Sequence, residues 1–195
     1  MHIDAERLIA EVQSLPTSLW GTTGGRVGVH RAADGIFLRG FAPADGNLPI
    51  EDRPALGYLP YVAEIIHAKI PAPAQRCLLA RLPGGAFIAP HIDRAPYFSQ
   101  TIRLHMAVIT HEQAFMYCAG FSYRMQAGEV WALNNCAMHG VLNADESRAR
   151  THLICDFLPT PELLQMLAAG DRGLGEVRQD VESRLTQPAR QQSIG

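Results

Sequence analysis

The spacing of apolar residues changes along the chain and predicts helices at both ends of a strand-rich middle. Residues 4–15 should form an amphipathic helix, because apolar residues recur there at helical spacing, as Leu8, Ile9, Val12 and Leu15. Two short strands, Arg26–His30 and Gly35–Arg39, are expected next, joined through an Ala-Ala-Asp-Gly turn. After a loop over residues 42–56, a second helix is expected over Tyr61–Ile70, where the prolines that follow would end it.

From residue 77 onwards, short apolar runs alternate with turn residues. Eight such runs follow one another closely: CLLARL, FIAPHI, TIRLHMAVI, AFMYCA, SYRM, EVWAL, HGVL and THLICDFL. Runs of this length at this spacing are typical of an antiparallel sandwich or barrel. Helices are expected again after Pro159, in PELLQMLAAG and EVRQDVESRL.

These patterns predict one mainly β domain over residues 1–195. We expect a variable helical and strand extension over 1–75, a β core over 76–158 and C-terminal helices over 159–195. A length of 195 residues is enough for one domain with a sizeable core. The composition agrees, because 47% hydrophobic residues and a formal net charge of −2 describe an ordinary globular protein.

The same composition argues against other classes of protein. A nucleic-acid-binding protein usually has a basic excess, which this chain lacks. The first residues include acids and no long apolar core, and no apolar run reaches the roughly 18 residues that a membrane span needs. The four cysteines form no CxxC pair, so a zinc knuckle or redox motif is not expected. We therefore expect a cytoplasmic protein with reduced cysteines and with neither nucleic acid nor membrane as a partner.

A candidate metal site begins in the segment APHID, residues 89–93. On an extended segment His91 and Asp93 point to the same face, because they are two residues apart. A further histidine, His139, follows several strands later. Two imidazoles and one carboxylate on one face of a metal are the ligands that non-haem iron(II) oxygenases use. Alone this triplet is weak evidence, because a turn with an Asx-type cap and a satisfied core histidine would supply the same residues.

Two of the expected core strands also carry an Arg-x-His pattern. Alternation places Arg103 and His105 on one face of TIRLHMAVI, and Arg150 and His152 on one face of ARTHLICDFL. A buried arginine without a partner is unfavourable, so an enclosed guanidinium implies an anion. A dicarboxylate ligand would satisfy it, because the guanidinium fork matches a carboxylate.

Structural roles are the alternative for the same residues. Arg150 could form an ion pair with Asp156 or Asp145, and Arg103 could form another ion pair. His105 could be a packed imidazole bonded to a carbonyl. Pattern alone does not separate these roles from ligand binding.

Over residues 77–158 the sequence resembles the aspartyl/asparaginyl β-hydroxylases, a branch of the 2-oxoglutarate/iron(II) oxygenases related to the bacterial cis-4-proline hydroxylases. The matching stretches are LPGGAFIAPHID, RLHMAVIT and MQAGEVWALNNCAMHGVLNADESRARTHLICDF. The ordered run PHxD, RLH, GExW, H, N and RxHL is far more specific than the triplet alone. The resemblance implies a double-stranded β-helix, which is a cupin-like jelly roll, with N-terminal and C-terminal helices.

The resemblance also implies roles for individual residues. His91, Asp93 and His139 would bind Fe(II). Arg150 would hold the distal carboxylate of 2-oxoglutarate, the co-substrate consumed together with O2. His105 would lie near the co-substrate carboxylate that chelates the metal.

Further residues are candidates for contact with the substrate. The resemblance places Arg103 close to the co-substrate, facing either co-substrate or substrate. Arg81, Arg94 and Tyr97 lie around the first metal strand and the loop after it, and loops at the mouth of a barrel commonly carry specificity. The alternative for each of these three is an exposed loop position without a ligand.

The chain departs from the family pattern at two positions near the expected site. The family usually has Asp-Asn-Ser after GExWxx, whereas this chain has Asn134-Asn135-Cys136. Asn134 therefore removes a charge near the distal histidine. The family often has a serine, as a co-substrate donor, on the strand before the first metal histidine, where alignment puts Ala80.

We therefore expect a 2-oxoglutarate- and Fe(II)-dependent dioxygenase. Its substrate would be an amino acid, or an amino-acid residue of a peptide or small natural product, hydroxylated at an aliphatic carbon. The alternative is a non-oxygenase cupin-like protein that binds a metal or a ligand. Such a protein would not need Arg150 aimed at the metal cavity. The sequence leaves the substrate, the stereochemistry and the oligomeric state open.

Overall fold

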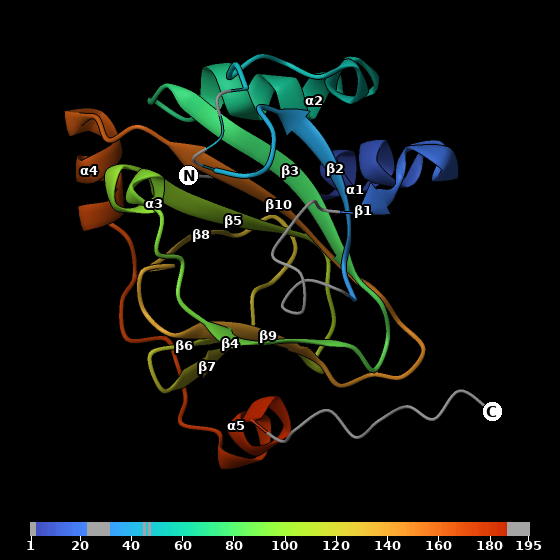
Figure 1. Ribbon diagram of the computed structural model, residues 1–195, viewed down its shortest axis with the longest axis vertical. Coiled ribbons are helices and arrows are strands. Elements are labelled where there is room, and N and C mark those ends of the chain that lie inside the picture. The colour runs from blue at the N-terminus through green and yellow to red at the C-terminus, as the bar shows by residue number, and fades with distance from the viewer. Residues whose placement is uncertain (1–2, 23–31, 45, 47, 187–195) are drawn as a thin grey trace.

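Two antiparallel sheets face each other across the middle of the molecule, as a computed structural model shows (Figure 1). The structure describes residues 3–22, 32–44, 46 and 48–186. The large sheet has the strand order β1-β2-β3-β10-β5-β8, and the small sheet has the order β4-β9-β6-β7. The strands are β1 (Gly21–Thr22), β2 (Asp34–Arg39), β3 (Ala74–Leu82), β4 (Phe87–His91), β5 (Ile102–Ile109), β6 (Ala114–Cys118), β7 (Phe121–Tyr123), β8 (Val130–Leu133), β9 (His139–Asn143) and β10 (Arg150–Phe157).

Helices lie on the outer sides of both sheets (Figure 1). The first, α1 (Ala5–Gln13), is capped by Asp4, whose side chain accepts a hydrogen bond from Arg7 N at 3.0 Å. The other helical segments are η1 (Thr17–Leu19), η2 (Pro54–Tyr58), α2 (Pro60–Glu64), the π-helical turn η3 (Ile65–Lys69), α3 (Pro96–Gln100), α4 (Pro161–Ala168) and α5 (Gln179–Thr186). Within the described ranges, none of these helices could span a membrane.

This architecture confirms the fold expected from the sequence, a mainly β jelly roll of cupin type with helices at both ends. Each of the eight apolar runs contributes a strand, from β3 to β10. The expected helix over Tyr61–Ile70 divides into α2 and η3, and α3 was not expected. The expected strand Gly35–Arg39 lies within β2, which pairs with β1. The strand expected over Arg26–His30, which was to pair with Gly35–Arg39, lies outside the described residues.

The two faces of the large sheet have different neighbours. Alternate residues of β5 and β10 point outwards and pack against α1 and α2: Leu104, Met106, Val108, Leu153, Cys155 and Phe157. The intervening residues point towards the small sheet. There, Leu82 and Ala107 join Ile88, Met116 and Val141 in an apolar cluster between the sheets. The alternation expected for both strands is therefore present.

The outer face of the small sheet is covered by α5 (Figure 1). Val181 and Leu185 of α5 pack on Phe115, Tyr117 and Leu142. Both sheets are thus shielded on their outer faces, and the interior between them is where the polar residues of the two Arg-x-His strands lie.

Candidate metal centre

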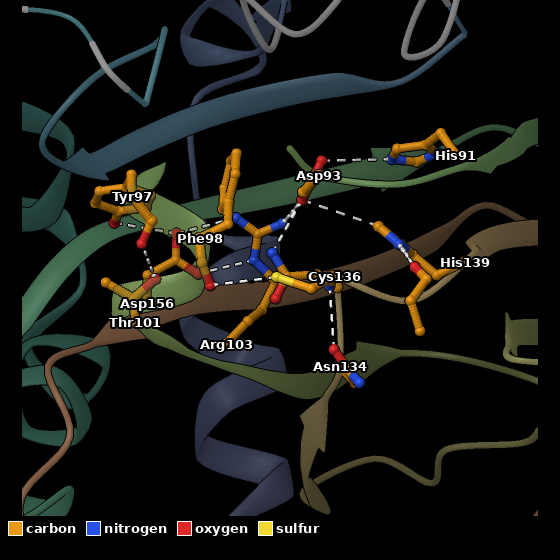
Figure 2. Close-up of polar contacts among 12 residues, drawn as sticks. His91, Asp93, Tyr97, Phe98, Thr101, Arg103, Asn134, Cys136, His139 and Asp156 are labelled. Atoms are coloured by element: carbon orange, nitrogen blue, oxygen red, sulfur yellow. Dashed lines mark hydrogen bonds and ion pairs between the residues drawn. The ribbon is translucent and has the colours of Figure 1, made fainter. Parts of the chain in front are cut away.

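His91, Asp93 and His139 meet between the two sheets (Figure 2). Their candidate ligand atoms all lie within 4.8 Å of one another. Nε2 of His91 is 3.9 Å from Asp93 Oδ1, and Nε2 of His139 is 4.0 Å from Asp93 Oδ2. Two imidazoles and one carboxylate at this spacing could hold a metal ion. The structure therefore brings together the three residues that the sequence analysis singled out.

A bulge in β4 aligns the first histidine with the second. Ile88 pairs with Val141, whereas His91 pairs with His139, so β4 carries one extra residue between these pairs. The extra residue allows both Ile88 and His91 to face the interior, which strict alternation would forbid. Gly140 permits the close approach, because a Cβ there would lie 2.8 Å from the carbonyl oxygen of Ile88.

Backbone carbonyls orient the two imidazole rings. Nδ1 of His91 is 2.8 Å from the oxygen of Ala89, and Nδ1 of His139 is 3.0 Å from the oxygen of Ala137. A carbonyl only accepts, so each neutral ring carries its proton on Nδ1 and presents the lone pair of Nε2 to the cluster. Burial lowers the pKa of His139 to about 4, which keeps this ring neutral near pH 7.

The Asp93 carboxylate is ionised and held from two sides. Arg103 Nη1 donates to Asp93 Oδ2 at 2.8 Å, and Asn135 Nδ2 donates to the same oxygen at 3.1 Å. The Asp93 backbone N also donates to the Asn135 carbonyl at 3.0 Å. Burial alone would raise the pKa of the Asp93 carboxyl, but Arg103, Asn135 and the two histidines together hold it below its usual value.

Arg103 is engaged by carboxylates on two sides (Figure 2). Its Nε and Nη2 donate to Asp156 Oδ1 and Oδ2 at 2.7 and 3.0 Å, while Nη1 reaches Asp93. Asp156 lies directly opposite Arg103 in the pairing of β5 with β10. The cross-strand carboxylate thus occupies the fork of Arg103, and the contact with co-substrate or substrate expected for Arg103 stays a prediction. The contacts that are present make Arg103 a positioning residue for Asp93.

Arg150 lies on the inner face of β10, at the opposite end of the strand from Asp156. It is 3% exposed, and its Nη2 is 2.8 Å from Nδ1 of His152. Asp156 and Asp145, the structural partners considered from the sequence, bind other arginines. In the described part of the chain, no carboxylate pairs with Arg150, and burial lowers its pKa to about 9.

His105 is buried on the inner face of β5, and its ring lies 5.8 Å from that of His152. Burial, together with the charges of Arg150 and Arg103, lowers its pKa well below the usual value, and His139 acts in the same direction. Both ring nitrogens are buried without a hydrogen-bond partner among the described residues. A packed imidazole bonded to a carbonyl, the structural alternative, is therefore not what the structure has. A buried imidazole in this state is unfavourable unless a polar ligand meets it.

The two departures from the family pattern lie at different depths. Ala80 is buried on the inner face of β3, directly opposite His152, where it offers no hydroxyl. Asn134 is exposed, and its Oδ1 accepts a hydrogen bond from Cys136 N at 3.2 Å (Figure 2). The charge missing at Asn134 would therefore sit at the surface of a turn, while the neighbouring Asn135 makes the contact with Asp93.

Arg81 points away from the site. It lies on the outer face of the large sheet, where its Nη2 donates to Asp34 Oδ2 at 2.8 Å and its guanidinium lies 4.2 Å from the centre of the Trp20 ring. Alternation along β3 puts it on the face opposite Ala80. The structure thus corrects the expectation that Arg81 contacts the substrate.

Arg94 and Tyr97 follow the metal carboxylate in the chain, within four residues of Asp93. Arg94 follows Asp93 directly and is exposed. Tyr97 stands on α3, and its hydroxyl donates to Asp156 Oδ2 at 3.1 Å (Figure 2). Burial raises the pKa of Tyr97, and Asp156 raises it further, so the hydroxyl stays protonated. Their expected contacts with a substrate remain predictions.

Sequence reasoning missed the roles of three residues of this interior, Asn135, Asp156 and Arg76, since Asp156 was considered only as a partner of Arg150. Asp156 carried a usable signal, because it continues the alternation of Arg150 along β10 and must face the interior too. Arg76 continues the alternation of Ala80 on β3 in the same way. Asn135 carried no such signal, because its position depends on the turn that follows β8.

The residues present fit a divalent metal ion together with a small anion. Two neutral imidazoles and a carboxylate suit iron(II) and similar ions, and the carbonyls and Arg103 orient these ligands as supporting groups usually do. The same interior contains a guanidinium, Arg150, that no carboxylate of the described residues meets, and an imidazole, His105, that has no hydrogen bond to them. An anion bound between Arg150 and the metal cluster would satisfy both.

Comparison with known proteins agrees with this arrangement. A model of the aspartyl/asparaginyl beta-hydroxylase family matches residues 49–159, while no curated protein matches the chain. An oxidoreductase of the 2OG-Fe(II) oxygenase family from Burkholderia pseudomallei has the same fold, with a TM-score of 0.52 and 14% identity over 80% of this chain and 77% of its own. A Cupin 2 conserved barrel domain protein from Salinispora arenicola aligns with a TM-score of 0.32 and 14% identity over 48% and 69% of the two chains. Because the family match spans more than half of the sequence, the chain belongs to the aspartyl/asparaginyl beta-hydroxylase family.

Proposed function

We propose that this protein is an iron(II)- and 2-oxoglutarate-dependent dioxygenase. It hydroxylates an aliphatic carbon of an amino acid, or of an amino-acid residue in a peptide or small natural product. Membership of a hydroxylase family supports the reaction class. The fold shared with a 2OG-Fe(II) oxygenase and the His-Asp-His cluster support iron and 2-oxoglutarate as its requirements.

The observation that carries the proposal is the state of Arg150. Its guanidinium is buried on the inner face of the large sheet, next to His152, whose ring lies 5.8 Å from that of His105, and the described residues supply it with no carboxylate. Such a charge is unfavourable unless an anion joins it on binding. A dicarboxylate that chelates the metal with one end and meets Arg150 with the other satisfies both requirements. A cupin that only binds a metal has no use for this arginine.

The chain's own residues divide the work of binding. His91, Asp93 and His139 would hold the metal, and Arg103 and Asn135 fix the orientation of the carboxylate. When bound, iron with 2-oxoglutarate and O2 supplies the oxidising chemistry that converts a C–H bond to C–OH. The protein supplies position and a dry cavity.

Three further residues would hold the co-substrate. Arg150 would bind its distal carboxylate, and His152 orients the guanidinium by accepting from Nη2. Neutral His105 would donate one ring N–H to a co-substrate oxygen near the metal. The apolar cluster between the sheets would limit the access of water to the bound co-substrate.

The test begins with binding and ends with turnover. Protein loaded anaerobically with iron(II) is titrated with 2-oxoglutarate while the visible charge-transfer band is followed. Air and a panel of L-amino acids are then added, and succinate is measured. We expect Arg150→Ala to weaken 2-oxoglutarate binding by about 10- to 100-fold, because it removes a charge-assisted bidentate contact.

Arg148→Ala is the matched control. Arg148 lies two residues earlier in the sequence, but its side chain is half-exposed and binds Glu112 and Asp145. This variant should bind 2-oxoglutarate as the wild type does. If the wild type neither binds 2-oxoglutarate nor forms succinate with any amino acid, the oxygenase proposal is wrong.

A further inference from the structure

A second buried arginine, Arg76, lies on the inner face of the large sheet. It sits on β3 with the same alternation as Ala80, so its side chain points between the sheets. It is 8% exposed. Its backbone N donates to the Tyr97 hydroxyl at 3.2 Å, and that hydroxyl donates to Asp156, the partner of Arg103, which places Arg76 on the metal side of the interior.

The guanidinium of Arg76 meets no anionic side chain in the part of the chain that the structure describes. Among the described residues it forms no ion pair, and its Nε is buried without a hydrogen-bond partner. The nearest carboxylate, Asp156, already accepts hydrogen bonds from Arg103 and from the Tyr97 hydroxyl. Burial lowers the pKa of Arg76, although Asp156 opposes this effect. This arginine therefore repeats the state of Arg150 in another part of the interior between the sheets.

Aromatic rings flank Arg76 on two sides. Its guanidinium carbon lies 5.6 Å from the ring centres of both Phe37 and Tyr97. Tyr97 in turn packs edge-to-face on Phe98 at 5.2 Å, and Arg103 lies 4.9 Å from the Phe98 ring (Figure 2). Half-buried aromatic surface thus runs from Arg76 to the arginine that holds the metal carboxylate.

Arg76 and Arg150 lie at opposite ends of this interior. Arg150 pairs with Leu82 across β3 and β10, six residues along β3 from Arg76, which is about 20 Å of extended strand. One small dicarboxylate cannot bridge both arginines and also reach the metal. Arg76 therefore needs an anion of its own.

We propose that Arg76 binds a carboxylate of the substrate, with Phe37, Tyr97 and Phe98 lining the space for its apolar part. This inference rests on the proposed function, because it assumes that a substrate enters beside the metal. It narrows the substrate to a small molecule or residue that carries a free carboxylate. The uncharged backbone of an internal peptide residue would not satisfy the guanidinium.

Binding can be tested without turnover. Iron(II)-loaded protein is kept anaerobic, with and without 2-oxoglutarate, and its Tm is measured with each of the twenty L-amino acids as the free acid and as the α-carboxamide. We expect at least one acid to raise the Tm when 2-oxoglutarate is also present. Arg76→Gln should weaken the binding of that acid by about 10- to 100-fold, because a charge-assisted contact is lost.

Arg81→Gln is the matched control, because Arg81 lies on the same strand but on the outer face, bound to Asp34. It should bind the acid as the wild type does. If an amino acid binds but its α-carboxamide does not, Arg76 binds the α-carboxylate. If the α-carboxamides of aspartate or glutamate still bind, Arg76 binds their side-chain carboxylate. Either result supports the proposal. The proposal is overturned if no acid binds, if uncharged amides bind equally well, or if Arg76→Gln binds the acid as tightly as Arg81→Gln.

The two proposals fail in different ways. If the wild type does not bind 2-oxoglutarate but binds an amino acid in a way that depends on Arg76, only the oxygenase proposal is overturned. Succinate formation that is unaffected by Arg76→Gln at low substrate concentration would overturn the role of Arg76 alone.

Discussion

The outer and inner faces of β5 and β10 are built from alternate residues of the same two strands, yet they differ completely. The outer face holds apolar side chains buried against α1 and α2, such as Leu104 and Leu153. The inner face holds Arg103, His105 and Arg150, of which His105 and Arg150 are also buried and the Arg103 side chain is 13% exposed. Burial alone therefore does not distinguish a core from a site, and the chemistry of what is buried does.

The outer face stabilises the fold, whereas the buried polar residues of the inner face lower its stability. Apolar burial on the outer face stabilises the fold. On the inner face, Arg103 is compensated by Asp156 and Asp93, whereas Arg150 and His105 are not compensated by described residues. An uncompensated buried charge is tolerated when a ligand completes it.

The largest expected effect tests the outer face. Leu153→Ala should lower the free energy of unfolding by about 2–5 kcal/mol, because it opens a cavity in a closely packed core. Ile154→Ala, one residue further along on the inner face, removes a partly exposed side chain and should cost clearly less. Urea denaturation of both variants measures the difference. Equal losses would mean that the two faces contribute alike.

The second prediction concerns acid. His105 and His152 are buried and have pKa values well below the usual one, so both are neutral in the folded chain. The unfolded chain takes up protons first as the pH falls through about 6.5. Each histidine should then remove about 1.4 kcal/mol of stability per pH unit below that value.

The histidine contribution can be isolated by substitution. His105→Gln should make the loss of stability between pH 6 and pH 5 shallower by the share of one histidine, as urea denaturation at each pH would show. A variant with the wild-type slope would mean that His105 is protonated in the folded protein.

The smallest expected effect is a gain. Arg150→Met replaces an uncompensated buried charge with an apolar side chain of similar length, so the free energy of unfolding should rise by about 1 kcal/mol. The gain stays modest because His152 loses the donor to its Nδ1. Thermal or urea unfolding without 2-oxoglutarate measures it. A clear loss of stability would show that Arg150 has a structural role.

Much of the fold was predictable because its signals are local. Each short apolar run from residue 77 onwards formed a strand, and the alternation that separated Arg103 and His105 from their apolar neighbours is the one observed. The short helix α3 was missed, since five residues carry too little periodicity to recognise. Arg81 was misplaced because its neighbourhood in the sequence was considered without its alternation along β3.

The metal cluster was predictable only in part. The sequence supplied its residue types and order, while the proximity of His91 to His139 depends on strand pairing and on the β4 bulge. Asn135 was missed because it reaches Asp93 through a turn. The cross-strand pairing of Asp156 with Arg103 requires the register between β5 and β10, which residue patterns do not specify.

By itself the residue pattern determined a sandwich or barrel of short strands with polar residues turned inwards on two of them, because the two-residue alternation of a strand is written directly in the order of residues, and the family resemblance implied the jelly roll. Only the tertiary structure decided which of those arginines are compensated. Arg103 meets two carboxylates, whereas Arg76 and Arg150 meet none among the described residues. The reason is physical: ion pairs form over a few ångströms, and strand register sets those distances.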